Sequence, residues 1–303
     1  MTSDATASSP ALPARLLPWL ALAATIVTWA TAFPAIRLAL RHVEPLSLAA
    51  LRFAIGAVLA LAWLLWRGWR GAAPRLPARD LALAALCGLV ATVGYGVLLS
   101  LGQRTVSAGA ASFLVKIESL VMAALAVLLL KERFGAWAWA GAAIALCGVG
   151  LIAAQQPGGF VLGGGALLVL GAACCSASGF VLQRPLIARH GALTVTAIAL
   201  LVAALATAPW LARGVEQALA APPQTLGWIL FLGALPTTVG MLCWNFALGH
   251  FGAARAGSFL YLVAPLATLL AWPLAGEVPA LETLLGGGLV LGGVLLVNSL
   301  GRR

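Results

Sequence analysis

Long apolar runs recur along this sequence, and they constrain its fold more than any other feature. A helix needs about 20 consecutive apolar residues to cross the hydrocarbon core of a bilayer. Ten such runs lie at residues 17–38, 46–66, 80–100, 106–130, 136–154, 162–183, 193–211, 226–248, 254–274 and 280–299. Only 9% of the 303 residues are charged, against about 25% in soluble domains. The sequence therefore predicts an all-α integral membrane protein with ten transmembrane helices.

The connections between the runs indicate how the chain is oriented. Residues 1–14, rich in Ser, Ala, Thr and Pro, are predicted to form a disordered tail, and the two longest connections, 67–79 and 213–225, to form loops. If the N-terminus is cytoplasmic, only Arg37, Arg41, Arg104 and Arg213 lie in connections on the opposite side of the membrane. The other basic residues of the connections then lie on the cytoplasmic side. Because Lys and Arg favour cytoplasmic loops, both termini are predicted to be cytoplasmic. We attribute the net charge of +10 to this bias, and expect no nucleic-acid partner.

The second half of the chain repeats the first. Thr92–Gly94 match Thr238–Gly240, Ser112–Leu114 match Ser258–Leu260, and Gly141 and Gly148 match Gly286 and Gly293. We divide the chain into a first repeat at 15–154 and a second repeat at 155–303, each with five spans. Because five is odd, the second repeat enters the membrane from the opposite side, so we expect two inverted five-helix repeats.

This construction favours a secondary transporter. Transporters built from inverted repeats bind substrate near the membrane midplane and expose it to each side in turn. Some channels are also built from inverted repeats, but the sequence shows no filter of repeated carbonyls and no charged ring. The aspartates, Asp4 and Asp80, lie outside the depth of the runs, which disfavours an intramembrane enzyme with a metal-diphosphate site. We expect no enzyme activity, no ATP-binding loop and no cofactor.

The histidines give no sign of a metal site. His42, His190 and His250 lie near the ends of separate runs, and no HExxH pattern occurs. No metal ligand is therefore predicted.

Several ordered motifs carry a resemblance that covers nearly the whole chain. They are Trp29–Phe33, Leu48–Phe53, Leu130–Arg133, Gly141–Gly150, Ala264–Leu266, Gly276-Glu277, Gly286 and Gly293-Val294. In these motifs the chain resembles the EamA-type branch of the drug/metabolite transporter superfamily. The resemblance implies ten helices, an inner-membrane location and a carrier of small metabolites, often an exporter. The chain departs from the family at Ser119-Leu120, where proline is frequent, and at Ser176–Gly179, where a Trp-Ala pair is frequent.

Two charged residues stand in the middle of the fourth run. Lys116 and Glu118 lie near the expected midplane, where an isolated ion costs about 3 kcal/mol on insertion scales. Two positions on an α-helix are about 200° apart, so we expect that the two side chains do not face each other. One is expected to line a cavity and the other to meet another helix. Lys116 could hold a carboxylate of the solute, and Glu118 could carry a coupling proton. The alternative is a structural pair between helices.

Arg52 and a set of aromatic and polar residues complete the candidate site. Arg52 lies a few residues inside the second run, where it could snorkel to the interface or hold a substrate carboxylate. The others are Trp29, Phe33, Tyr95, Trp244, Asn245 and Tyr261. They could form the wall of a pocket for an amphipathic solute, or they could pack against neighbouring helices without a binding role.

Two further groups of residues are assigned structural roles. Glu132 and Glu277 are each expected to stabilise the N-terminus of the helix that follows. Glycines between 141 and 150 and between 286 and 293 are expected to pack the fifth and tenth spans closely, as a scaffold and a possible homodimer contact.

The sequence as a whole predicts a carrier that moves a small metabolite through the bilayer by alternating access. Arg52 and Lys116 favour carboxylate-bearing solutes such as amino acids, with export as the expected direction. The alternative is a multidrug exporter whose hydrophobic cations bind Glu118.

Overall fold

The computed structural model describes residues 12–72, 74–118, 120–121, 124–125, 135–154, 164–251 and 259–299, and these residues are all-helical, without strands. Six helical stretches are long and apolar enough to cross a membrane: Leu16–Ala39, Pro45–Trp69, Ala78–Gly102, Gly164–His190, Ala192–Ala220 and Pro223–Phe251. Shorter apolar helices cover Ala108–Ile117, Trp139–Ile152, Val263–Ala275 and Leu281–Gly293. Each of the predicted spans overlaps one of these stretches, so the expectation of a multi-pass membrane protein is met.

The described residues of the first repeat form five helical stretches. They are α1 (Leu12–Ala39), α2 (Pro45–Trp69), the continuous stretch α3 (Ala78–Cys87), η1 (Gly88–Gly94) and α4 (Tyr95–Gly102), then α5 (Ala108–Leu114) with η2 (Val115–Ile117), and α7 (Ala136–Ala154). The segment η1 is a π-helix and η2 is a 3-10 turn. Helix α1 begins at Leu12, so it takes in the last residues of the predicted tail. The predicted loop after α2 is present between Trp69 and Ala78.

The second repeat has the same order. Its elements are α8 (Gly164–His190), α9 (Ala192–Thr207), η3 (Ala208–Trp210), α10 (Leu211–Ala220), α11 (Pro223–Leu232), η4 (Gly233–Gly240), α12 (Met241–Phe251), η5 (Leu260–Leu262), α14 (Val263–Ala275) and α15 (Leu281–Ser299). The prediction of a loop at 213–225 is wrong, because α10 occupies most of it. Gly214 of α10 packs against the backbone of α2, and Arg213 pairs with Glu44 at 2.6 Å.

The π-helical segments occur at matching places in the two repeats. Thr92–Gly94 lie in η1, and their matches Thr238–Gly240 lie in η4. Segment η1 packs against α8 and α9, and η4 packs against α1 and α2. Each π-helix therefore contacts the first two helices of the other repeat, which brings the middles of the two repeats together.

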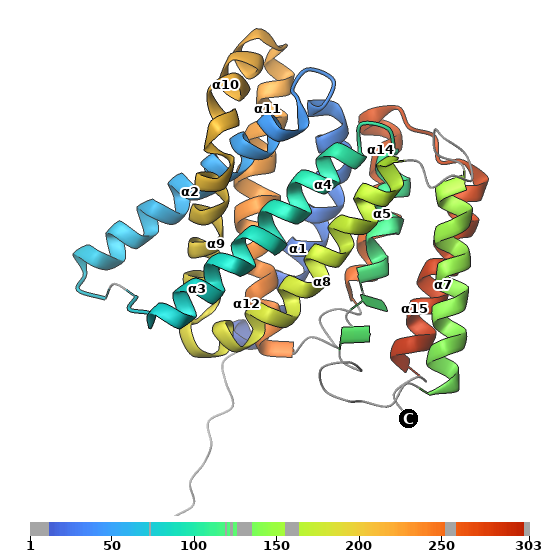
Figure 1. Cartoon of the computed structure of the whole chain (residues 1–303), viewed down its shortest axis with the longest axis horizontal. Coiled ribbons are helices and arrows are strands. Elements are labelled where there is room, and N and C mark those ends of the chain that lie inside the picture. Colours follow the sequence, from blue (N-terminus) through green and yellow to red (C-terminus); the bar gives the residue numbers. More distant parts are fainter. Residues whose placement is uncertain are drawn as a thin grey trace, which may run out of the picture.

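Helices α7 and α15 pack against each other at one side of the bundle (Figure 1). A Cβ added to Gly148 would lie 2.5 Å from the Gly286 carbonyl oxygen. One added to Gly293 would collide with the backbone of α7. The predicted close packing of these spans is confirmed, because only glycine lets the backbones approach this far.

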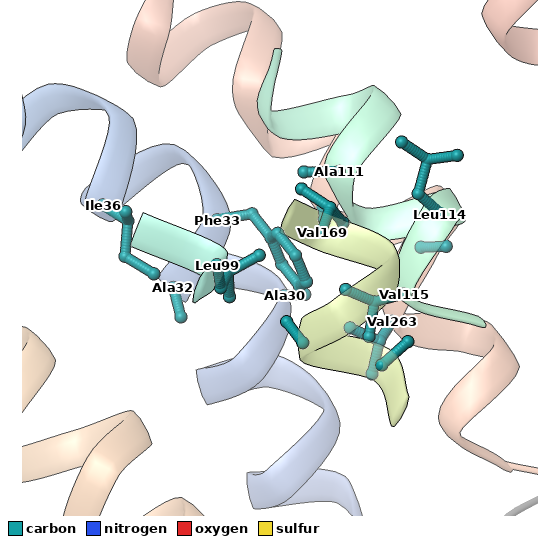
Figure 2. Close-up of a cluster of buried hydrophobic side chains, with 14 of the residues drawn as sticks. Ala30, Ala32, Phe33, Ile36, Leu99, Ala111, Leu114, Val115, Val169 and Val263 are labelled. Atoms are coloured by element: carbon teal, nitrogen blue, oxygen red, sulfur yellow. The ribbon is translucent and has the colours of Figure 1, made fainter. Parts of the chain in front are cut away.

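The buried core lies between helices of both repeats. Figure 2 shows part of it, with Phe33 of α1 among side chains such as Leu99 of α4, Val169 of α8 and Val263 at the start of α14. Phe33 is 3% exposed. This apolar cluster surrounds one side of the cavity described next.

Candidate functional site

A cavity with a volume of about 80 Å³ lies between the two repeats. Most of its lining is apolar, and its charged members are Arg52, Lys116 and Glu118. The complete lining is Trp29, Ala32, Phe33, Ile36, Arg52, Phe53, Ala91, Thr92, Tyr95, Gly96, Leu99, Val115, Lys116, Glu118, Ser176, Phe180, Pro236, Thr237, Met241 and Val263. The structure thus brings six predicted site residues together: Arg52, Lys116, Glu118, Trp29, Phe33 and Tyr95.

Lys116 and Glu118 both face this cavity and contact each other. Lys116 Nζ lies 3.4 Å from Glu118 Oε1, and the side chains are 3% and 6% exposed. The expectation that they do not face each other is wrong. Lys116 lies in the 3-10 turn η2 and Glu118 directly follows it. In a 3-10 turn two positions lie about 120° apart around the axis, whereas in an α-helix they lie about 200° apart, or about 160° the shorter way round. Two long side chains can close that gap, so they form one buried ion pair.

Glu118 has a second partner. Ser176 Oγ of α8 donates to Glu118 Oε2 at 2.9 Å. Both carboxylate oxygens therefore have a donor, one from each repeat. A buried charge that is paired and hydrogen-bonded avoids most of the penalty of an isolated ion.

Arg52 points into the cavity rather than toward an interface. It is 6% exposed, so the snorkelling alternative is wrong. Its Nε and Nη2 donate to Thr237 Oγ1 at 3.3 and 3.2 Å. Its Nη1 is buried without a hydrogen-bond partner among the residues that the structure describes. A buried guanidinium donor without a partner is costly, so this side of Arg52 is chemically suited to accept an anion.

Aromatic side chains form the apolar wall. Trp29, Phe33 and Tyr95 line the cavity, together with Phe53 and Phe180. Trp29 Nε1 donates to the Pro236 carbonyl of η4 at 3.1 Å, which fixes the indole against the other repeat. Tyr95 lines the same cavity as Arg52 and Glu118. The wall therefore joins an apolar surface to the charged groups.

The remaining predicted residues lie elsewhere. Trp244 is fully packed behind the wall, with its ring 5.7 Å from Trp29 and 5.2 Å from Phe180. Asn245 belongs to a buried network: Gln183 Nε2 donates to Asn245 Oδ1 at 3.2 Å, and Asn245 Nδ2 donates to Thr196 Oγ1 at 2.8 Å. The side chain of Tyr261 lies outside the described part of the structure.

Ser176, Thr237 and Phe180 are cavity residues that sequence reasoning did not predict as site residues. Ser176 falls in the stretch that departs from the family, which is the signal that could have pointed to it. Thr237 lies next to the repeat motif Thr238–Gly240, in a position where the first repeat has Ala91. Only the second repeat has a hydroxyl at this position, just as only the first repeat has a lysine at the position of Lys116.

A polar cluster ties the two repeats at the bundle end where α1 finishes. Arg37 Nε pairs with Glu277 Oε1 at 3.0 Å, and Arg37 Nη1 donates to the carbonyls of Gln103 and Arg104 at 2.5 and 2.7 Å. Glu277 Oε2 accepts from the Ala108 backbone N–H at 2.8 Å. The prediction that Glu277 would stabilise the N-terminus of the helix that follows it is therefore wrong, because its carboxylate stabilises the N-terminus of α5 instead. We call these groups the Glu277 cluster; Glu132 lies outside the described residues.

At the opposite end, Asp80 of α3 meets the end of α8. Arg189 Nη1 donates to both Asp80 oxygens at 3.0 and 2.9 Å, and His190 Nε2 lies 2.7 Å from Oδ2. Among the described residues, no three His, Cys, Asp or Glu side chains group as metal ligands would. Asp80 therefore links α3 to α8 across the two repeats.

Comparison with known proteins decides the family. The EamA-like transporter family matches this chain twice, at residues 17–154 and 163–299. The chain belongs to the EamA-like transporter family. The two matches correspond to the two repeats, and each contributes side chains to the cavity. Members of this family are transporters, so the chain is a membrane transporter of small metabolites and not an enzyme.

Individual relatives cover nearly the whole EamA-like chain. It is 37% identical over 293 residues to a probable terminal-alkyne amino-acid exporter of Streptantibioticus cattleyicolor, covering 93% of this chain and 94% of the relative. It is 35% identical over 271 residues to the uncharacterized transporter YdfC of Bacillus subtilis, covering 88% and 86%. A probable amino-acid metabolite efflux pump of Salmonella typhimurium is 26% identical, with 92% and 93% covered. A crystal structure with 22% identity has the same fold, with a TM-score of 0.62 over 94% of this chain and 98% of that one.

Proposed function

We propose that this protein is a secondary transporter that binds an amino acid, or another small carboxylate-bearing solute, between its two repeats. The observation that carries the proposal is the unpartnered Nη1 of Arg52, a buried donor in a cavity with an apolar wall. Arginine binds carboxylates through charge-assisted hydrogen bonds. The carboxylate of the solute would contact Arg52, and its side chain would lie against Trp29, Phe33 and Phe180.

The charges of the cavity favour an anionic group over a cation. Arg52 and Lys116 are basic and Glu118 is acidic, and Glu118 already has donors on both oxygens. A hydrophobic cation would have to replace Lys116 or Ser176 to reach it. The volume of about 80 Å³ also favours a small solute, since drug-sized pockets measure about 300–1,000 Å³. Multidrug export stays the alternative for the test below.

We further propose the membrane arrangement expected from the sequence. All ten helical stretches cross the inner membrane, the repeats are inverted, and both termini are cytoplasmic. The matching π-helices and the reciprocal contacts of η1 and η4 support a two-fold relation between the repeats. Alternating access would then rock one repeat against the other around Arg52, Lys116 and Glu118. A homodimer stays a prediction.

The printed names of two relatives support the solute class. One is a probable exporter of a terminal-alkyne amino acid and another a probable amino-acid metabolite efflux pump. We extend the amino-acid preference and the export direction to this chain as part of the proposal.

The test is transport by the purified protein in liposomes. Labelled amino acids and cationic dyes are offered with and without a pH gradient, to wild type, Arg52→Ala, Lys116→Ala and Glu118→Gln. The expected result is amino-acid flux that Arg52→Ala abolishes. Because a ligand that binds only the folded state raises its stability, the same amino acids should raise the melting temperature of wild type and not of Arg52→Ala.

A matched control is Arg104→Ala, which removes an arginine at the bundle end that does not line the cavity. It should retain flux. Dye transport that depends on Glu118 alone would replace the proposal with the cation-exporter alternative. Flux that survives all three cavity substitutions would refute the site.

A further inference from the structure

Hydroxyl side chains of the second repeat form hydrogen bonds with two of the three charged side chains that the first repeat brings to the cavity. Thr237 Oγ1 accepts from Arg52 Nε and Nη2 at 3.3 and 3.2 Å. Ser176 Oγ donates to Glu118 Oε2 at 2.9 Å. Arg52 and Glu118 belong to the first repeat, and both hydroxyls belong to the second. The orientation of each charge therefore depends on the position of one repeat relative to the other.

Thr237 is placed by a local distortion of its helix. It lies in the π-helix η4, directly after Pro236, which has no N–H to donate. The Pro236 carbonyl accepts from Trp29 of α1, and the Thr237 hydroxyl accepts from Arg52 of α2. Two successive residues of η4 thus bond to the first repeat. Single π-helical turns are often found at functional sites, where they redirect side chains.

The contact with Thr237 determines which part of Arg52 is free. The hydroxyl occupies the Nε and Nη2 side of the guanidinium, and Nη1 is left buried and unpartnered within the described structure. Because the guanidinium is planar, fixing one side also fixes the direction of the remaining donor. Without the hydroxyl, Arg52 could turn toward the acidic Glu118, which lines the same cavity.

We propose that Thr237 is the positioning residue of the carboxylate site, and that it makes solute recognition by Arg52 depend on contact between the repeats. The inference rests on the proposed function, in which Arg52 binds the solute carboxylate. It adds that the second repeat orients the binding group of the first. The matching position in the first repeat, Ala91, has no hydroxyl, so one site of this kind is formed, not two.

Transport kinetics of Thr237→Val and Thr237→Ser test this proposal. Two probes are compared. The first is leucine, or the amino acid that is transported fastest in the panel above, and the second is the carboxamide of that same amino acid. Thr237→Val keeps the side-chain shape and removes the hydroxyl. It should raise KM for the amino acid about tenfold with a smaller change in maximal rate, and should leave KM for the carboxamide within about twofold. Thr237→Ser should restore the wild-type KM.

The matched control is Thr238→Val. The hydroxyl of Thr238 donates to the Gly233 carbonyl at 2.8 Å within the same element, so the substitution is equivalent but does not touch Arg52. It should leave the ratio of the two KM values unchanged. If Thr237→Val is not recovered folded, Thr237→Ala is measured in its place.

The outcomes separate this inference from the proposed function. If Arg52→Ala abolishes amino-acid transport but the hydroxyl-free Thr237 variant has the wild-type KM, Thr237 is no positioning residue. An equal rise in KM for acid and amide, or no rescue by serine, would also overturn the proposal. If Arg52→Ala itself has no effect, the carboxylate site is wrong, whatever Thr237 does.

Discussion

Replacing Gly148 by alanine is expected to destabilise the folded protein by about 2–3 kcal/mol. The new Cβ would lie 2.5 Å from the Gly286 carbonyl oxygen, 2.8 Å from the Val290 nitrogen and 2.9 Å from Leu289 Cβ. Two of these neighbours are backbone atoms, so no rotamer change relieves the overlap. Helices α7 and α15 must separate by roughly 1 Å, which forfeits about a quarter to a half of the local dispersion attraction. The cost therefore falls at the upper end of the range for overpacking.

Gly150→Ala is the matched control on the same helix. A Cβ at Gly150 meets nothing within 4 Å, so its effect should be neutral or stabilising by at most about 1 kcal/mol, the helix propensity gained over glycine. The assay is unfolding of the purified protein in one detergent, followed by circular dichroism against heat and against added SDS. Equal midpoints for the two variants would refute the close packing of α7 on α15.

Three further substitutions probe polar side-chain contacts within the bundle. Glu277→Gln should cost less than about 1 kcal/mol because its ion pair is partly exposed, and thermal unfolding should show the difference shrinking at high salt. Asn245→Ala should cost about 1–3 kcal/mol, since it leaves the buried amide of Gln183 without its acceptor; an unfolding midpoint equal to wild type would contradict the network. Trp29→Phe should cost about 0.5–1.5 kcal/mol through the lost bond to the Pro236 carbonyl, and an unchanged melting temperature would show that this bond contributes nothing.

Much of the fold could be predicted from the sequence, because a helix needs a minimum apolar length to cross a bilayer and that length can be read from the sequence. Apolar runs of about 20 residues specify where helices can cross a bilayer, and the glycines of α7 and α15 specify which backbones meet. The helix within residues 213–225 was not predicted, because the arginine and prolines of this stretch are typical of a loop. Its helix depends on tertiary contacts, such as Gly214 against α2 and Arg213 against Glu44, which composition does not reveal.

The site was predicted less completely, for a geometric reason. Charges in apolar runs are costly, so Arg52, Lys116 and Glu118 could be singled out from position alone. Their mutual contacts could not. The pairing of Lys116 with Glu118 depends on a 3-10 turn, and Thr237 reaches Arg52 from a π-helix. Periodicity arguments assume regular α-helices, and they fail where the helix is locally tightened or widened.

The Glu277 cluster has a consequence for how often this end of the bundle opens. Its contacts are partly exposed, and such contacts are typically worth about 0.2–1 kcal/mol each. The cluster has four such contacts, which sum to about 1–4 kcal/mol. If this end opens as the proposed alternating access requires, a middle value of about 2.5 kcal/mol would leave on the order of one molecule in a hundred open at equilibrium. Under alternating access, solute on that side would meet a binding-competent protein only in this minor population. Its apparent affinity there would be about a hundredfold weaker than its intrinsic affinity, so a cluster outside the cavity would make the transporter bind unequally on its two sides.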